Sequence, residues 1–326
     1  MAAALARVLD GRARRDEVLA SLAAELDAAG RPPVGFATVL VGDDEASARY
    51  VGLKHEAARR VGIEVRGVAL PASTDQVGLE SELDGLAVDP AVHGVLLQLP
   101  LPEGSGLDAL AAAERIPPDK DVDGMTSTSL GRLLLGAPGH RPATAAGVLD
   151  LLARHGVGVA GRRAAVVGTG TMVARPLALM LLAAGASAVS LLDPADPDAA
   201  RACRSADLVV SDAARAHLVG PGWVAAGATV VDVGVSFVDG RLVGDVDPAV
   251  AEVAGTLVPN PGGAGPMTVA MLLSNTLAAA RAAGGLGSLA AASPAGGSPA
   301  AASPAAASPA GGSPALGSLR RAGVGG

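Results

Sequence analysis

A lysine lies on the apolar side of a predicted amphipathic helix, which covers residues 46–62. At 100° per residue, Lys54 falls on the same narrow stripe as Tyr50, Ala57 and Val61. Two interpretations fit this position. In the first, the lysine stem covers apolar surface and its ammonium group reaches water. In the second, Lys54 faces a cleft, where partial desolvation lowers its pKa and allows proton exchange near neutral pH.

A glycine-rich segment, VVGTGTMVA (166–174), follows a predicted strand and begins a predicted helix. Gly168 and Gly170 allow a tight turn that brings backbone amides, at the positive end of the helix, against a pyrophosphate. Ala174 stands where a third small residue permits close packing, one position later than in the usual dinucleotide fingerprint. The next predicted strand ends at Asp193, where an acid can accept a hydrogen bond from a ribose 2′-hydroxyl. We expect a dinucleotide site here; the alternative is a turn that uses its glycines only for packing.

Three further segments place polar or conformationally special residues in unusual surroundings. Gln98 lies inside the apolar segment GVLLQLPLP, where an amide must find partners or face a cavity. The segment PPDKDVDGM (117–125) places Asp121 and Asp123 in a loop bounded by proline and glycine. The glycine-rich segment VPNPGGAGPMT (258–268) directly precedes the last predicted helix and suits close backbone approach to a flat ligand.

These residues are positioned by strands and helices that alternate along the chain. Strands are predicted at 35–42, 64–70 and 94–102, with helices between them. The pattern then restarts with a strand, the glycine turn, a helix and further strands, and a last helix ends near Gly284. Such alternation predicts an α/β fold in which parallel strands are covered by helices. At 326 residues the chain is long enough for two domains.

The composition limits the classes of function. A net charge of −7 without a basic block argues against a nucleic-acid partner. Cys203 is the only cysteine, so we expect neither an internal disulfide nor a cysteine-ligated metal, which suits a reducing cytosol. No apolar run reaches the roughly 18 residues that span a membrane, and the acidic residues within 1–30 argue against a transit peptide. We therefore expect a cytoplasmic protein that binds no metal.

Residues 285–326 have a different composition. Ser-Pro recurs at residues 293, 298, 303, 308 and 313 in a background of alanine and glycine. Because nothing in this segment can bury a core, we expect a disordered tail. Either the tail has no part in catalysis, or its Ser-Pro array binds a partner or is modified.

The chain resembles the bifunctional methylenetetrahydrofolate dehydrogenase/methenyltetrahydrofolate cyclohydrolases. Matching segments occur in the family's order and spacing from residue 1 to about residue 284: VGDDEASARYVGLKHEAARRVGIE, GVLLQLPLP, PPDKDVDG, VVDVGV, LVGDVD and PGGAGPMT. The resemblance implies a folate domain over 1–142, completed by a returning helix at 266–284, and a Rossmann-like nicotinamide domain over 143–265. It also implies a folate cleft between the two domains and a homodimer.

The resemblance further implies roles for individual residues. Lys54 matches the family's catalytic lysine, and Gln98 matches the glutamine that supports it. Tyr50 matches the tyrosine that lines the pterin, and Asp121 matches the acid that holds the pterin. The other implied substrate-binding residues are Ser47, Pro261, Gly262, Gly263 and Thr268. The implied cofactor-binding residues are Gly168, Thr169, Gly170, Arg175, Asp193 and Val235.

The residue types suit the implied reactions, which are oxidation of 5,10-methylenetetrahydrofolate by a nicotinamide and hydrolysis of the product to 10-formyltetrahydrofolate. A carboxylate can accept hydrogen bonds from the exocyclic amine and the adjacent ring N–H of a pterin. A lysine of lowered pKa, held by an amide rather than a carboxylate, can move the protons that the hydrolysis requires.

The choice between NAD and NADP is open from the sequence. The family's bacterial members generally use NADP. Asp193 would repel a 2′-phosphate, and neither Thr169 nor Gly170 supplies a basic side chain, which favours NAD. Arg175 can still reach a phosphate, so NADP stays an alternative.

The chain departs from the family in two segments of the implied folate domain and its border. MTSTS (125–129) lacks the usual aromatic and asparagine, and PATA (142–145) replaces Pro-Cys-Thr-Pro. These changes leave open an enzyme of the same fold that acts on a different pterin or one-carbon carrier. A second alternative, which the Ser-Pro tail suggests, is a non-catalytic protein that recruits partners through that tail. The retained Lys54, Gln98 and Asp121 count against the second alternative.

Overall fold

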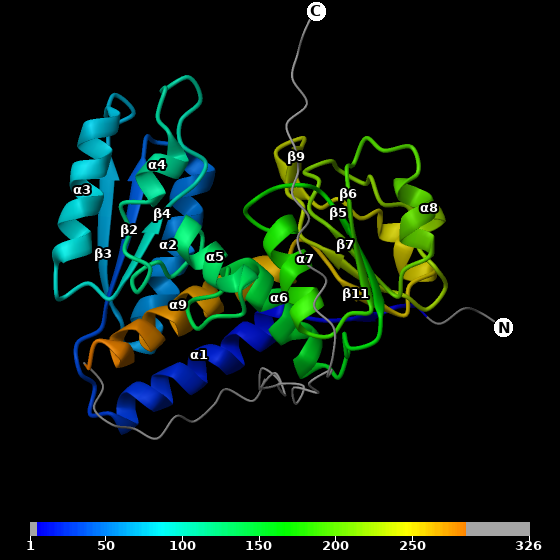
Figure 1. Cartoon of the computed structure of the whole chain (residues 1–326), viewed down its shortest axis with the longest axis horizontal. Helices are drawn as coiled ribbons and strands as arrows, with labels where there is room; N and C mark the ends of the chain where they lie inside the picture. The colour runs from blue at the N-terminus through cyan, green and yellow to red at the C-terminus, as the bar shows by residue number, and fades with distance from the viewer. Residues whose placement is uncertain (1–4, 285–326) are drawn as a thin grey trace, which may run out of the picture. The chain divides into compact units, whose positions relative to one another are not determined.

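The computed structural model describes residues 5–284, which form two α/β lobes, each built on its own parallel sheet (Figure 1). Residues 1–4 and the predicted tail at 285–326 lie outside the described residues. The predicted α/β class with parallel strands is confirmed.

The first lobe contains three parallel strands in the order β3-β2-β4. The central strand β2 is buried along its whole length, because helices cover both faces of the sheet. The helix between β3 and β4 packs Leu79, Leu83 and Leu86 into the core. The elements are β2 (Gly35–Val41), α2 (Glu45–Val61), β3 (Glu64–Leu70), α3 (Gln76–Val88), β4 (Gly94–Leu97), α4 (Ala109–Ala113) and α5 (Ser127–Leu134).

The second lobe contains six parallel strands in the order β1-β11-β8-β7-β5-β6. Its two innermost strands, β7 and β8, are buried throughout. The elements are β1 (Arg7–Val8), β5 (Arg163–Val167), α7 (Ala174–Ala183), β6 (Ala188–Leu192), α8 (Ala199–Arg204), β7 (Leu208–Ser211), β8 (Thr229–Asp232) and β11 (Thr256–Val258). An antiparallel pair, β9 (Ser236–Val238) and β10 (Arg241–Val243), and two 3-10 turns, Pro221–Trp223 and Pro248–Glu252, complete it.

Three helices lie side by side next to the two sheets: α1 (Gly11–Ala28), α6 (Ala143–Arg154) and α9 (Ala264–Ala282) (Figure 1). Leu272 and Leu277 of α9 share a buried cluster with Leu22 of α1 and Phe36 of β2. The last helix is therefore part of the first lobe's core, although the whole second sheet precedes it in the sequence.

The structure differs from the sequence-based outline at two strands. The predicted strand 94–102 ends at Leu97, because the prolines at 100 and 102 have no N–H to donate to a ladder. The second difference is β1, which pairs with β11 in the second sheet although the resemblance implied that residues 1–142 form the folate domain. A strand of two residues has no periodic pattern that would predict it.

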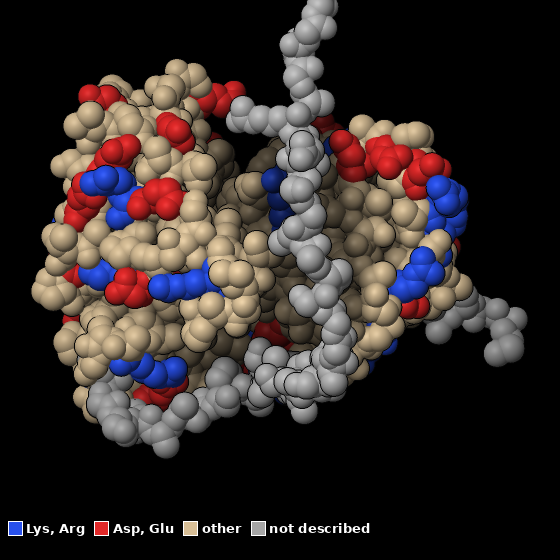
Figure 2. Space-filling model, viewed as in Figure 1, with Lys and Arg blue, Asp and Glu red and all other residues tan. Residues whose placement is uncertain are grey.

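The described surface carries mixed charges. On the face shown in Figure 2, basic side chains lie close to acidic ones in small groups, and the surface is hollowed between the two lobes. No helix between residues 5 and 284 combines the length and the apolar character that crossing a bilayer requires. Within the same range, no three His, Cys, Asp or Glu side chains are grouped so that they could hold a metal ion.

A glycine marks a close approach of α6 to α9. A Cβ at Gly147 would lie 2.8 Å from the Cβ of Met267 and 3.0 Å from its carbonyl carbon. In an open helix, Gly→Ala stabilises by about 0.5–1 kcal/mol because alanine loses less backbone freedom on folding. At Gly147 the added methyl would overlap backbone, so we expect Gly147→Ala to lower the free energy of unfolding by about 1–3 kcal/mol.

Gly85→Ala in α3 is the matched control for this measurement by denaturant unfolding. A Cβ at Gly85 has no atom within 4 Å, so that variant should gain the ordinary helix stabilisation. Equal changes in the two variants would show that the approach of α6 to α9 tolerates a methyl group.

Candidate active site

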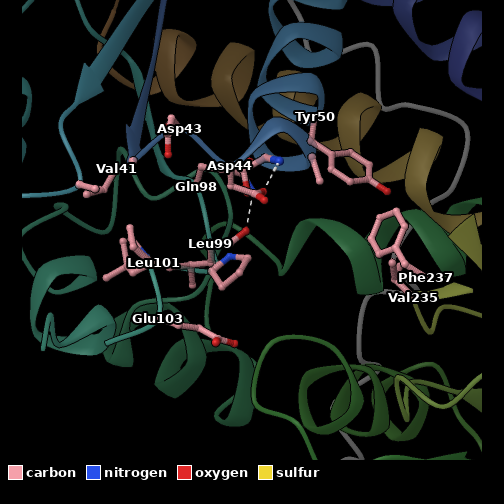
Figure 3. A pocket seen from close by; sticks show the side chains of 16 residues that line it. Val41, Asp43, Asp44, Tyr50, Gln98, Leu99, Leu101, Glu103, Val235 and Phe237 are labelled. Carbon is pink, nitrogen blue, oxygen red and sulfur yellow. Dashed lines mark hydrogen bonds between the residues drawn. The ribbon is translucent and has the colours of Figure 1, made fainter. Parts of the chain in front are cut away.

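A cavity of about 650 Å³ opens at the carboxyl end of the first sheet. Its walls come from residues 41–50, which lead from β2 into α2, from residues 98–103, which follow β4, and from Val235 and Phe237 of the second lobe. Figure 3 shows Tyr50 and Phe237 on the same side of the cavity. Ligands of α/β proteins bind at the carboxyl ends of parallel strands, and this cavity has that position.

Lys54 bonds to a buried amide in the wall of this cavity, although its own side chain is not among the residues that line it. Its Nζ donates a hydrogen bond to Gln98 Oε1 at 2.7 Å. The amide is itself oriented, because Gln98 Nε2 donates to the carbonyl of Leu99 at 2.5 Å and the Gln98 backbone N–H donates to Val39 at 2.8 Å. Gln98 is 8% exposed, and Lys54 is half-buried. The ammonium group is therefore held by a fixed amide oxygen.

The pKa values of two neighbouring groups are shifted toward neutrality. Burial lowers the pKa of Lys54, and the charge of Asp123 opposes that shift. Burial raises the pKa of Asp123 to about 6, although the charge of Lys54 lowers it. Both shifts bring the pKa values of the acid and the base closer together, a pattern typical of catalytic sites.

Asp121, which the resemblance assigns to the pterin, makes structural contacts instead. Its Oδ1 accepts hydrogen bonds from the backbone N–H groups of Gly124 at 2.9 Å and Met125 at 3.2 Å, and its Oδ2 accepts one from Thr126 at 2.8 Å. The residue is only 2% exposed. Because both carboxylate oxygens are occupied by the loop that follows, the geometry favours Asp123 over Asp121 as the carboxylate available near the lysine. The role of either acid in holding the pterin stays a prediction.

Tyr50 and Ser47 line the cavity from the first turns of α2. The Asp44 side chain caps this helix by accepting a hydrogen bond from the Ser47 N–H at 2.7 Å, which holds the pKa of Asp44 below its usual value. The cap fixes where the helix begins, so that Tyr50 and Lys54, one turn apart, project toward the same region. Tyr50 is 37% exposed, which leaves its ring accessible from the cavity.

The residues predicted from the loop before α9 do not line this cavity: Pro261, Gly262, Gly263 and Thr268. A Cβ at Gly263 would lie 2.4 Å from Val258 Cγ1 and 2.5 Å from the carbonyl oxygen of Pro259. The glycine is thus required by packing within the protein. Thr268 donates a hydrogen bond to the hydroxyl of Thr144 at 3.0 Å, which joins α9 to α6. A role for this loop in substrate binding stays a prediction.

The glycine-rich turn lies between β5, which ends at Val167, and α7, which begins at Ala174. Gly168 has a φ of +131°, and a Cβ there would lie 2.3 Å from the carbonyl oxygen of Asp212. A Cβ at Gly170 would meet nothing closer than 3.6 Å. Gly168 is therefore required by conformation and packing, whereas Gly170 leaves room beside the amino end of the helix.

The other predicted cofactor residues divide between this turn and the cavity. Asp193 is exposed directly after β6, and its Oδ1 accepts a hydrogen bond from the Ala195 N–H at 2.8 Å. Arg175 is also exposed, and its Nε donates to the carbonyl of Thr169 at 2.8 Å. Val235 lines the cavity near Tyr50 instead, beside Phe237, which the sequence did not single out.

These groups fit a nicotinamide dinucleotide. The turn leaves room at Gly170, a helix amino end stands beside it, and the acid of Asp193 follows the neighbouring strand. One group opposes the fit: Asp212 Oδ2 already accepts a hydrogen bond from the Ala174 N–H at 3.1 Å. Together, the dinucleotide lobe and the lobe that holds Lys54 define a two-domain α/β dehydrogenase.

The comparisons with known proteins give the particular family. Residues 9–123 match the model of the tetrahydrofolate dehydrogenase/cyclohydrolase catalytic domain, and residues 142–284 match that of the tetrahydrofolate dehydrogenase/cyclohydrolase NAD(P)-binding domain. The chain is 49% identical to the bifunctional protein FolD 2 of Frankia alni over 287 residues, which are 86% of this chain and 98% of that protein.

Two solved structures are also similar. The bifunctional enzyme FolD from Campylobacter jejuni has a TM-score of 0.81 and 36% identity, covering 84% of this chain and 98% of that one. The Trypanosoma brucei enzyme, solved with NADP and an inhibitor, has a TM-score of 0.80 and 36% identity, covering 85% of this chain and 98% of that one.

The chain therefore belongs to the tetrahydrofolate dehydrogenase/cyclohydrolase family. It is a bifunctional enzyme, a methylenetetrahydrofolate dehydrogenase and methenyltetrahydrofolate cyclohydrolase, which takes a folate substrate and a nicotinamide cofactor. The alternative of a non-catalytic binding protein is rejected.

The two acids of the DVD segment are expected to respond differently to substitution. Asp121→Ala leaves three backbone N–H groups without this acceptor, two of them in buried bonds, so we expect a loss of about 3 kcal/mol or more in the free energy of unfolding. Asp123→Asn removes a buried charge that no backbone group needs, so its stability at neutral pH should be unchanged or higher. Folate binding should be lost in Asp123→Asn.

Thermal unfolding and equilibrium binding of a folate analogue check both expectations. If Asp123→Asn bound the analogue as tightly as the unaltered chain, Asp123 would not be the acid that holds the folate.

Proposed function

We propose that Lys54 transfers the protons of the hydrolytic step while Gln98 holds it in place. We further propose that Asp123 and Tyr50 bind the pterin of 5,10-methylenetetrahydrofolate, which is oxidised and then hydrolysed to 10-formyltetrahydrofolate. The observation that carries this proposal is the 2.7 Å hydrogen bond from Lys54 Nζ to Gln98 Oε1 at the cavity wall.

The pterin would be held by charge and by a flat surface. The carboxylate of Asp123 can accept from the exocyclic amine and the adjacent ring N–H, a bidentate arrangement that fixes the orientation of the ring. Tyr50 offers an aromatic face for stacking. Its ring and that of Phe237 both line the cavity, which gives the substrate apolar contacts from both lobes.

Proton movement is the task of Lys54. Water attacks the methenyl carbon, and collapse toward the formyl product requires a proton to move near N5 or N10 of the folate. A lysine whose pKa is lowered by burial can hold or release that proton near neutral pH. Gln98 orients the ammonium group without a full negative charge, so it does not lock the lysine in its protonated form.

The dehydrogenase step makes different demands on the chain. A bound nicotinamide supplies the hydride acceptor, and the protein contributes position rather than acid or base. The turn at 168–173 and the amino end of α7 would orient the pyrophosphate. Val235 and Phe237 reach the substrate cavity from the same lobe, which supports an approach of the nicotinamide to the folate there.

We propose NAD as the preferred cofactor, with NADP as the alternative. Asp193 stands exposed after β6, where its charge would repel a 2′-phosphate. Arg175, the nearest candidate for a phosphate contact, already donates its Nε to Thr169. Both observations support NAD.

A homodimer and a cytoplasmic location stay predictions. The edge position of β6 and the exposure of Leu182 and Leu191, which are 50% and 40% exposed, support an interface on the second lobe.

Lys54→Ala should separate the two activities. We expect cyclohydrolase turnover, measured with methenyltetrahydrofolate, to fall about 10²–10⁴-fold, the usual contribution of a general acid or base. Part of the dehydrogenase activity should survive, because hydride transfer needs no proton from the lysine. The methenyl absorbance follows both reactions.

Arg59→Ala provides the control, since it removes an exposed cation from the same helix. Equal loss of both activities in Lys54→Ala would indicate that the lysine mainly binds the substrate. No turnover by the unaltered chain with either nicotinamide would favour the alternative of a different pterin or one-carbon carrier.

Asp193→Ser should shift the cofactor preference. Removing the like charge should raise kcat/KM for NADP relative to NAD by about tenfold or more. Asp196→Ser is the control, because Asp196 is an exposed acid in the same loop. If the ratio of kcat/KM for NADP to kcat/KM for NAD were unchanged in Asp193→Ser, Asp193 would not discriminate between the two cofactors at the ribose.

A further inference from the structure

Asp212 stands where the dinucleotide turn should present free amide groups. It directly follows β7, and its backbone N–H donates to Val167, the last residue of β5, at 2.7 Å. Its side chain reaches across to the next element, where Oδ2 accepts from the N–H of Ala174, the first residue of α7, at 3.1 Å. A carboxylate thus occupies one of the amides that a helix amino end offers to a phosphate.

Two glycines of the turn, Gly168 and Gly170, lie next to Asp212. A Cβ at Gly168 would lie 2.3 Å from the carbonyl oxygen of Asp212, and a Cβ at Gly170 would lie 3.6 Å from its Oδ2. Asp212 is therefore packed beside both glycines, and the carboxylate lies on the side of the turn that faces the helix amino end. A pyrophosphate bound there would be a close neighbour of this side chain.

Charged groups surround Asp212 on every adjacent element, but none neutralises it. Asp193 follows β6 and Asp232 ends β8, at the carboxyl edge of the same sheet. Asp245 follows β10 of the antiparallel pair and accepts a hydrogen bond from Ser211 Oγ, the residue before Asp212, at 2.8 Å. Two arginines lie near the bonded pair in the sequence, Arg175 next to Ala174 and Arg215 three residues after Asp212. Arg175 donates its Nε to Thr169, and Arg215 donates its Nη1 to Pro194. Within residues 5–284, Asp212 makes no ion pair.

Burial raises the pKa of Asp212 to about 6, the bond from Ala174 lowers it, and the charge of Asp245 raises it. The group is therefore largely ionised above pH 7 when the turn binds no anion. A pyrophosphate brings two further negative charges to the same place, where the repulsion is only partly screened because Asp212 is half-buried.

We propose that Asp212 is a cofactor-responsive residue of this chain, and that the dinucleotide binds at the turn with the Asp212 carboxyl protonated. This inference rests on the proposed nicotinamide site at residues 168–173. One proton passes from solvent to the carboxylate for each dinucleotide bound, and it returns to solvent when the dinucleotide leaves. Cofactor affinity then falls as the pH rises above neutrality, by up to tenfold per pH unit for one linked proton.

Titration calorimetry of NAD binding to the full chain tests the proposal without turnover. Near pH 7.5, the proton taken up on binding comes from the buffer. The observed binding enthalpy should therefore differ between HEPES and Tris by nearly the difference between the ionisation enthalpies of the two buffers. Asp212→Asn should abolish the buffer dependence, and it should bind NAD at least tenfold more tightly than the unaltered chain near pH 8.

Asp207→Asn is the matched control, because Asp207 lies just before the opposite end of β7 and its Oδ2 also accepts a backbone hydrogen bond, from Arg163 at 2.9 Å. It should retain proton uptake. The buffer dependence of the binding enthalpy can be measured on the unaltered chain without any variant. If Asp212→Asn does not fold, Asp212→Ala takes its place.

Binding of NAD without proton uptake, or uptake that persists in both Asp212 variants, overturns the role of Asp212 and leaves the cofactor site in place. Absence of NAD and NADP binding at every pH down to pH 6 overturns the cofactor site itself, and the inference with it.

Discussion

The proposed hydrolytic chemistry depends on an ammonium group held by an amide in a partly buried position. A carboxylate at the same place would bind Lys54 more strongly and keep it protonated, whereas Gln98 orients it and leaves its proton mobile. The amide is fixed by a backbone bond to β2 and by its own bond to Leu99. The ends of two strands and one capped helix therefore position a single hydrogen-bonded pair, Lys54 and Gln98.

Most buried carboxylates of the protein serve the backbone rather than the substrate. Asp121 accepts three amide hydrogen bonds. Asp232 accepts from Asp245 N–H at 2.9 Å, and Asp245 accepts from Ala213 N–H at 2.6 Å and Ser211 Oγ at 2.8 Å. These bonds explain Asp232 of VVDVGV and Asp245 of LVGDVD, each of which ties its own loop to another. Among residues 5–284, no backbone N–H donates to the Asp123 carboxylate, which supports its proposed role in binding a ligand.

The sequence predicted the regular elements well because their signals are periodic. The buried strand β2, the edge strand β3 and the helix α3 have the ranges that apolar patterning indicates, and the glycine turn lies between a strand and a helix as expected. The roles of Asp121 and Asp123 could not be separated in this way. They are two residues apart in a loop, and only the backbone path decides that amides three to five residues later point at Asp121. A resemblance between motifs identifies the segment, but it does not decide which of two nearby acids is available to a ligand.

The same distinction gives Asp212 its particular place among the acids of the second lobe. Asp232 and Asp245 bind amides outside the turn at 168–173 and the amino end of α7, so their bonds do not occupy a donor of that turn. Asp212 binds an amide at the amino end of α7, which is the group a phosphate would use. An interaction that stabilises the free protein therefore competes with one that the cofactor would make. Because the same donor cannot satisfy two anions fully, the state of this one carboxyl group is linked to occupancy of the turn.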